Sequence, residues 1–196
     1  NMSTGDPRFC EPPRSDSRWA ALAVAVRDFN AALGATPQVE HVGLVSFASN
    51  YTGCGFSNSS SSIDQSLSSD VSRVDSAMNA ISARVFNGNT NIAAGMQNGI
   101  NVLTNPATAR PYALKTMILL TDGIRTEGGD PMNLTGNAVD NDIVIHTITF
   151  GDSADQAEMQ AIAQATGGKH YHAPDAQRLR EVFQEIAMTM LVTLTE

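Results

Sequence analysis

The sequence predicts an α/β fold in which a mostly parallel, doubly wound sheet carries helices on both faces. Segments whose apolar residues repeat every three or four positions alternate along the chain with short apolar runs rich in β-branched residues. This alternation is typical of helices that connect parallel strands of one sheet. A length of 196 residues is enough for one such domain, so we expect a single domain over residues 1–196.

The first predicted elements are a loop, a helix and a strand. Residues 1–14 contain several prolines and a glycine and are predicted to be irregular. From Ser15 to Leu33 the apolar residues have helical spacing, with Ser15 or Asp16 as the cap. His41–Ser49 is predicted to be a strand because its β-branched and aromatic residues favour an extended backbone.

The rest of the chain continues the alternation. Residues 50–70 are rich in Ser, Gly and Asn and predict a mobile loop that returns through a short edge strand. Further helices are predicted over residues 71–85, 92–103 and 130–140, around Met159 and Ile162, and over 179–190, and further strands over 115–121, 143–150 and 169–173. Residues 191–196 are expected to form a C-terminal tail.

One strand of such a Rossmann-like sheet is missing from this pattern. A doubly wound sheet normally begins with a central strand that leads into the first helix. Here only the irregular residues 1–14 precede the helix that starts near Ser15. We expect the strand to lie before Asn1; the alternative is that Leu191–Thr195 supplies it.

Charge and motifs argue against several classes of protein. The chain has 20 acidic and 12 basic residues, a net charge of −8, and its basic residues are scattered, so it lacks the basic face that a nucleic acid needs. Its apolar runs are far shorter than the roughly 20 residues of a membrane-spanning helix. It contains no glycine-rich phosphate loop and no Gly-x-Ser-x-Gly elbow, so we expect a protein that is not an enzyme.

The only two cysteines are Cys10 and Cys54. They could form one disulfide in an oxidising compartment, which would stabilise the fold by about 4 kcal/mol in the chain-entropy model. They could equally remain free thiols in a reducing compartment. The sequence leaves both possibilities open.

Polar residues gather at three places that are predicted to meet at the carboxyl edge of the sheet. These places are the loop at Asn1–Ser3, the loop Asn87–Asn91, and Asp122–Gly123 at the end of a buried strand. They offer amide, hydroxyl and carboxylate oxygens, which suit Mg²⁺ or Mn²⁺ better than a caged Ca²⁺. The alternative is structural, with Thr90 capping the next helix and Asp122 holding its own turn.

Two histidines form a second, weaker candidate site. His170 and His172 alternate on a short strand, so both rings would lie on one face. A zinc site needs further ligands, and none is evident nearby in the sequence. We therefore expect a solvated strand face.

Three motifs together resemble a von Willebrand factor type A domain. They are the segments Thr90–Gly95, Ile118–Gly123 and Ile148–Gly151. The resemblance covers most of the chain, from the helix of Trp19 to the helix of Phe183. It implies a metal-ion-dependent adhesion site, which in that family combines an Asp-x-Ser-x-Ser loop after the first strand, a Thr before the third helix and an Asp after the fourth strand.

The resemblance implies that Thr90 and Asp122 are metal ligands. In the family a Met often follows the Asp-x-Ser-x-Ser loop, so Met2 would align with that Met and Asn1 with the second Ser. Asn1 and Ser3 are therefore weaker candidate ligands, and the preceding Asp and Ser would lie before Asn1. Residues 1–14 would be the remnant of this first motif.

The resemblance also implies a function. It predicts a module that binds proteins through a divalent cation, Mg²⁺ or else Mn²⁺ or Ca²⁺, whose coordination is completed by an Asp or Glu carboxylate of the partner. The Gly167–Tyr171 ending and the proline-rich insertion are most similar to bacterial proteins associated with tight-adherence pilus assembly. That similarity implies an extracytoplasmic or cell-surface location, with an anchor outside this chain.

Two alternatives remain open. One is a structural assembly domain whose metal site is degenerate because Asn1 replaces a serine. The other is a metal-dependent hydrolase in which Asp122 holds the catalytic ion.

Overall fold

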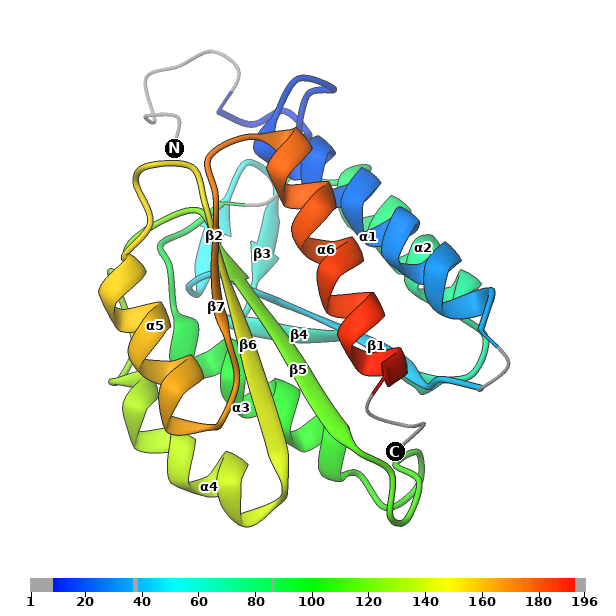
Figure 1. Ribbon diagram of the computed structural model, residues 1–196. Coiled ribbons are helices and arrows are strands. Elements are labelled where there is room, and N and C mark those ends of the chain that lie inside the picture. Colours follow the sequence, from blue (N-terminus) through cyan, green and yellow to red (C-terminus); the bar gives the residue numbers. More distant parts are fainter. Residues whose placement is uncertain (1–8, 37–38, 86, 193–196) are drawn as a thin grey trace.

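The protein consists of a central layer of strands between two layers of helices (Figure 1). The computed structural model describes residues 9–36, 39–85 and 87–192. One face is covered by α1 (Arg18–Gly34), α2 (Ser72–Ser82) and α6 (Ala176–Val192), and the other by α3 (Ile92–Thr104), α4 (Thr135–Asp140) and α5 (Gln156–Ala165). A short 3₁₀ helix, η1 (Pro131–Leu134), leads into α4.

The strands form three separate hydrogen-bonded groups. The strands β5 (Lys115–Thr121), β6 (Ile143–Phe150) and β7 (His170–Ala173) are parallel, in the order β5-β6-β7. The strands β1 (Val42–Phe47) and β4 (Ser61–Ser68) pair antiparallel, and β2 (Tyr51–Gly53) and β3 (Phe56–Asn58) form a hairpin. The α/β fold with a mostly parallel sheet is thus confirmed.

Alternation along β6 divides the apolar core between the two faces of the sheet. Ile148 and Phe150 pack with α1 and α6, where the rings of Phe29 and Phe183 meet edge to face at 5.6 Å. The strand residues before them, such as Ile145, face α3 and α5. Because successive side chains of a strand point to opposite faces, a single buried strand supports both clusters.

A cavity separates β1 from β5. Among the described residues no hydrogen-bonded pairing joins these two strands, so each has one unpaired edge. The cavity has a volume of about 440 Å³ and is mostly apolar, and it is lined by all of β1, by residues 116–121 of β5 and by helices of both layers. All six residues of β1 are only half-buried, since nothing described packs along that edge.

The cavity has the place and the two free edges that a central strand would use. That this strand lies before Asn1 stays a prediction. The alternative, a strand beginning at Leu191, is wrong, because α6 continues through Leu191 and Val192. Of the predicted tail, residues 191 and 192 belong to α6 and residues 193–196 lie outside the described residues.

Two predicted boundaries differ from the structure. The first helix begins at Arg18, because Ser17 rather than Ser15 or Asp16 is its cap and accepts a hydrogen bond from the Ala20 N–H at 3.2 Å. The predicted mobile loop at 50–70 is instead the β2–β3 hairpin and the eight-residue strand β4. Cys54 and Gly55 both have positive φ, the backbone conformation of a tight two-residue hairpin turn.

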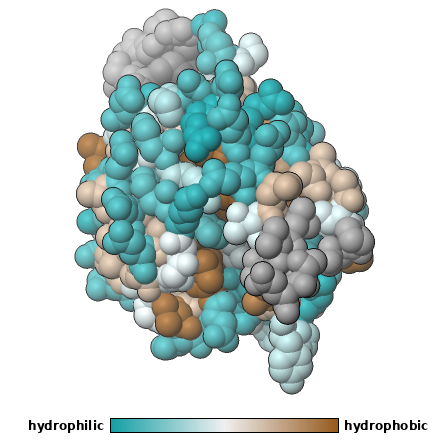
Figure 2. Space-filling view, viewed as in Figure 1, coloured by the Kyte–Doolittle hydropathy of each residue, from teal (hydrophilic) through white to brown (hydrophobic). Residues whose placement is uncertain are grey.

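Within the described ranges, no helix combines the length and the apolar character needed to cross a bilayer. The face shown in Figure 2 is mostly hydrophilic, with apolar side chains in small separate groups.

Candidate metal centre

Thr90 and Asp122 lie on neighbouring loops at the carboxyl edge of the sheet. Thr90 precedes α3, Asp122 follows the last residue of β5, and both line the same end of the cavity. The Thr90 Oγ1 lies 3.5 Å from the position that a Cβ on Gly123 would take. The structure thus places the Thr90 hydroxyl against the residue that directly follows Asp122.

Hydrogen bonds join the two loops into one unit. The Thr90 N–H donates to Thr126 Oγ1 at 2.9 Å, and the Thr90 carbonyl accepts from the N–H groups of Thr126 and Glu127 at 3.0 and 3.2 Å. Gly128 has a φ of +82°, and a Cβ there would lie 2.1 Å from Asn91 Oδ1. Only glycine allows this approach, so the loop after Asp122 is fixed against the start of α3.

The Thr90 hydroxyl is not a helix cap. Asn91 caps α3, because its Oδ1 accepts a hydrogen bond from the Ala94 N–H at 3.0 Å. No group among the described residues forms a hydrogen bond with the Thr90 hydroxyl. The structural alternative for Thr90 is therefore wrong, and its oxygen is available to a ligand.

The Asp122 carboxylate does not hold its own turn either. Thr121 does so: its Oγ1 donates to the Gly123 carbonyl at 3.2 Å and accepts from the Gly123 N–H at 3.3 Å. The structural alternative for Asp122 is wrong for this reason. The contact that the structure gives the Asp122 carboxylate is an ion pair with Arg18, with 3.5 Å between Nη1 and Oδ2.

Arg18 and Ser153 complete this edge, and the sequence patterns assigned neither of them to the metal site. Arg18 Nη1 donates to the Asp122 carbonyl at 3.3 Å and to Ser153 Oγ at 3.2 Å, and Ser153 Oγ donates to the same carbonyl at 3.1 Å. Asp155 caps α5, because its Oδ1 accepts a hydrogen bond from the Glu158 N–H at 3.0 Å. The sequence did contain one signal for Arg18: it is a basic residue at the first position of a helix that starts at the carboxyl edge.

The donor set fits a hard divalent cation. The described ranges contain no cluster of three or more His, Cys, Asp and Glu side chains that could hold a metal. A site here would therefore combine one carboxylate, hydroxyl oxygens and water, which suits Mg²⁺ or Mn²⁺. The weaker candidates Asn1 and Ser3 lie outside the described residues.

The histidine pair is not the solvated face that we expected. The Nδ1 atoms of His170 and His172 lie 3.0 Å from the hydroxyls of Thr147 and Thr149, and both rings are half-buried. Burial lowers the pKa of His170, and the nearby His172 lowers it further. The two threonines of β6 face the same side as the histidines, a pairing across strands that the separate sequence segments do not show.

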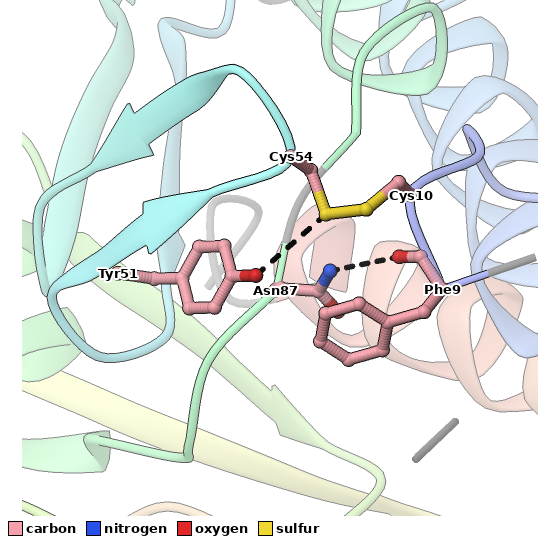
Figure 3. Close-up of a disulfide and its surroundings, with 5 residues drawn as sticks. All are labelled: Phe9, Cys10, Tyr51, Cys54 and Asn87. Carbon is pink, nitrogen blue, oxygen red and sulfur yellow. Dashed lines mark hydrogen bonds between the residues drawn. A yellow bond between two sulfur atoms is a disulfide. The ribbon is translucent and has the colours of Figure 1, made fainter. Parts of the chain in front are cut away.

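A disulfide joins Cys10 to Cys54 beside this edge (Figure 3). It links the N-terminal loop to the β2–β3 hairpin, where the rings of Phe9 and Tyr51 meet edge to face at 6.3 Å. The Asn87 Nδ2 donates to the Phe9 carbonyl at 2.9 Å. This hydrogen bond, next to the disulfide, connects the N-terminal loop to the segment that carries Thr90.

Comparisons with known proteins identify the fold and the family. The family description von Willebrand factor type A domain matches residues 15–185. Proximal thread matrix protein 1 from the mussel byssus, solved with a zinc-occupied MIDAS motif, is 14% identical with a TM-score of 0.68, over 86% of this chain and 42% of its own. The pilus adhesin SpaC from Lactobacillus rhamnosus GG is 18% identical with a TM-score of 0.66, over 88% of this chain and 28% of its own.

A third structure matches over most of both chains. BatB from Bacteroides thetaiotaomicron, a conserved hypothetical protein, is 15% identical with a TM-score of 0.64, over 94% of this chain and 91% of its own. The present chain spans less than half of the mussel protein and of the adhesin. No curated protein matches the sequence. The matched residues and the shared fold place the chain in the von Willebrand factor type A domain family.

Proposed function

We propose that this domain binds a partner protein through a divalent cation held by Thr90 and Asp122. The observation that carries the proposal is the position of these two side chains. They come from adjacent loops that hydrogen bonds join. The structural roles considered for Thr90 and Asp122 belong to other residues: Asn91 caps α3, and Thr121 holds the turn after β5. A hydroxyl and a carboxylate are thereby left at one edge of the sheet for an ion.

The cation would supply the attraction for an Asp or Glu carboxylate of the partner. The protein carries a net charge of −8, and Asp122 adds its own negative charge to the site. A bound divalent ion reverses the local sign and keeps a coordination position for the incoming oxygen. Mg²⁺ or Mn²⁺ suits this donor set, with Ca²⁺ as the third choice. Asn1 and Ser3 remain weaker candidates for further ligands.

The proposed role is binding without catalysis. Ser153 lies at this edge, and its hydroxyl contacts Arg18 and a backbone carbonyl rather than a histidine base. Among the described residues of this edge no serine hydroxyl is hydrogen-bonded to a histidine, an arrangement that favours a docking site over a serine hydrolase.

We place the domain in adhesion or in the assembly of a pilus or surface structure outside the cytoplasm. The Cys10–Cys54 disulfide supports this location, because structural disulfides persist in oxidising compartments. The similarity in fold to a pilus adhesin supports the pilus role at the level of the fold. A tight-adherence pilus and an anchor outside this chain are the finer forms of the proposal.

One observation favours a second candidate, a structural assembly domain that works without metal. Arg18 already places a positive charge at the Asp122 carboxylate. In that case binding of the partner would be insensitive to chelator, whereas the leading proposal predicts that chelator abolishes it.

Isothermal titration calorimetry with MnCl₂ tests the leading proposal. Asp122→Ala and Thr90→Ala should each weaken Mn²⁺ binding by at least about tenfold, because each removes a ligand. Two controls are matched to them: Asp152→Ala removes the same charge from a neighbouring loop, and Thr90→Ser keeps the hydroxyl. Both controls should bind like the wild type. Unchanged affinity in Asp122→Ala and Thr90→Ala would contradict the proposal.

A further inference from the structure

Arg18 lies close to the position that a cation bound by Asp122 would occupy. Its Nη1 is 3.5 Å from Asp122 Oδ2, and the two side chains are 49% and 57% exposed. A divalent ion that coordinates Oδ2 at about 2 Å would therefore lie within about 6 Å of the guanidinium. At that distance two positive charges repel each other, and both draw on the same carboxylate.

The guanidinium is held in this position by groups other than the carboxylate. Nη1 donates to Ser153 Oγ at 3.2 Å and to the Asp122 carbonyl at 3.3 Å, and neither acceptor is a candidate metal ligand. Gly151 has a φ of +75°, and a Cβ there would lie 2.9 Å from Nη2, so the backbone packs closely on the guanidinium. An ion that takes the carboxylate leaves these contacts intact and the positive charge nearby.

We propose that Arg18 is a built-in competitor of the divalent ion at Asp122 and sets the affinity of the site for metal. This inference rests on the proposed function. Without the ion, Arg18 neutralises the Asp122 carboxylate. With the ion, the anchored guanidinium remains as a nearby like charge, so the ion binds more weakly than the oxygen ligands alone would allow.

The variant Arg18→Gln tests this competition in Mn²⁺ titrations of the full chain. Glutamine removes the charge and keeps an N–H donor on a shorter side chain. We expect Mn²⁺ to bind more tightly than in the wild type by a factor on the order of five, the size that a partly exposed ion pair allows. The gain should shrink as salt is raised from low to high ionic strength, because salt screens the repulsion.

Two control variants separate this local effect from a change in net charge. Arg27→Gln removes the same charge from the same helix nine residues further on, about 13 Å along its axis, where Arg27 donates to Asn79 Oδ1. Its Mn²⁺ affinity should equal that of the wild type. Arg18→Lys keeps the charge and should also remain close to the wild type.

The outcomes distinguish this inference from the proposed function. Equal or weaker Mn²⁺ binding in Arg18→Gln, with binding still lost in Asp122→Ala, overturns the role of Arg18 and leaves the metal site standing. Absence of Mn²⁺ binding in both the wild type and Arg18→Gln overturns both. NMR of the wild type provides a test that needs no variant. The chemical shifts of the Arg18 guanidinium should change during a Mg²⁺ titration, with the same midpoint as Mg²⁺ binding. Unchanged chemical shifts would overturn the competition.

Discussion

The guanidinium of Arg18 and the carboxylate of Asp122, 104 positions apart in the chain, lie 3.5 Å from each other at the carboxyl edge of the sheet. Through this contact the first turn of α1 meets the loop after β5, and Ser153 adds the loop after β6. Three loops from distant parts of the sequence therefore share one polar cluster. This cluster, with Thr90 beside it, is the basis of the proposed metal site.

The glycine at position 128 should be essential for the shape of the site. In Gly128→Ala the new Cβ would approach Asn91 Oδ1 to 2.1 Å at a φ of +82°. We expect the free energy of unfolding to fall by about 1–3 kcal/mol, and Mn²⁺ binding to weaken because Thr90 moves with Asn91. Urea denaturation and calorimetry measure the two effects.

Gly136 provides the control for this variant. It lies in α4, and a Cβ there meets nothing within 4 Å. Gly136→Ala should therefore leave Mn²⁺ binding unchanged and stabilise the protein by about 0.4–1 kcal/mol. Equal behaviour of the two alanine variants would contradict the close approach at Gly128.

Loss of the Cys10–Cys54 disulfide should destabilise the fold substantially. The bond closes a loop with a sequence separation of 44 residues, so reduction or Cys10→Ser/Cys54→Ser should lower the free energy of unfolding by about 4 kcal/mol. Urea unfolding with and without reductant measures this change. An unchanged urea midpoint after complete reduction, verified by thiol labelling, would show that the stability of the fold does not depend on the disulfide.

Acidification should lower stability through two histidines. Burial lowers the pKa of His146 and of His170 below the ordinary value of 6.5. The unfolded chain therefore binds more protons in this range, so their contribution to stability is full above pH 6.5 and is lost as the pH falls through the folded pKa values. The Tm should fall between pH 7.5 and pH 5.5.

The double variant His146→Asn/His170→Asn tests whether these two histidines cause the fall in Tm. It should flatten the fall in Tm over the same pH range, because asparagine does not titrate. A wild-type Tm that stays constant or rises on acidification would contradict the assigned direction of these pKa values.

The free edge of β5 should be visible in amide exchange. In a parallel strand successive N–H groups point to opposite sides, so every second amide of β5 points toward β6 and the others toward the cavity. We expect the amides of the second set to exchange at least about tenfold faster, whereas residues 147–149 of β6, which pair with both β5 and β7, should be protected. Uniformly slow exchange along β5 would show that the cavity edge is occupied.

Local sequence patterns predicted the buried strands best. Lys115–Thr121 and Ile143–Phe150 were predicted with the bounds that the structure shows, because continuous apolar runs specify strands covered on both faces. The β2–β3 hairpin was missed, since its turn lacks the usual Asn-Gly pair and depends on Cys54, which the disulfide holds. The strand β4 was underestimated because its serines carry no apolar alternation.

The site was predictable where it follows from topology. The rule that ligands bind at the carboxyl ends of strands was enough to bring Thr90 and Asp122 to one edge. Arg18 and Ser153 could not be predicted, because their contacts depend on where α1 and α5 begin. The predicted start of α1 was misplaced, because its cap is Ser17 rather than Ser15 or Asp16.

The most direct test of the metal site is an anomalous difference map from crystals grown with MnCl₂. The account predicts a Mn²⁺ peak at the carboxyl edge, with an Asp122 carboxylate oxygen at about 2 Å and the Thr90 hydroxyl bound directly or through one water. Crystals grown at a saturating concentration of MnCl₂ that show no anomalous peak beside Asp122, whether or not Mn²⁺ is bound elsewhere, would contradict it.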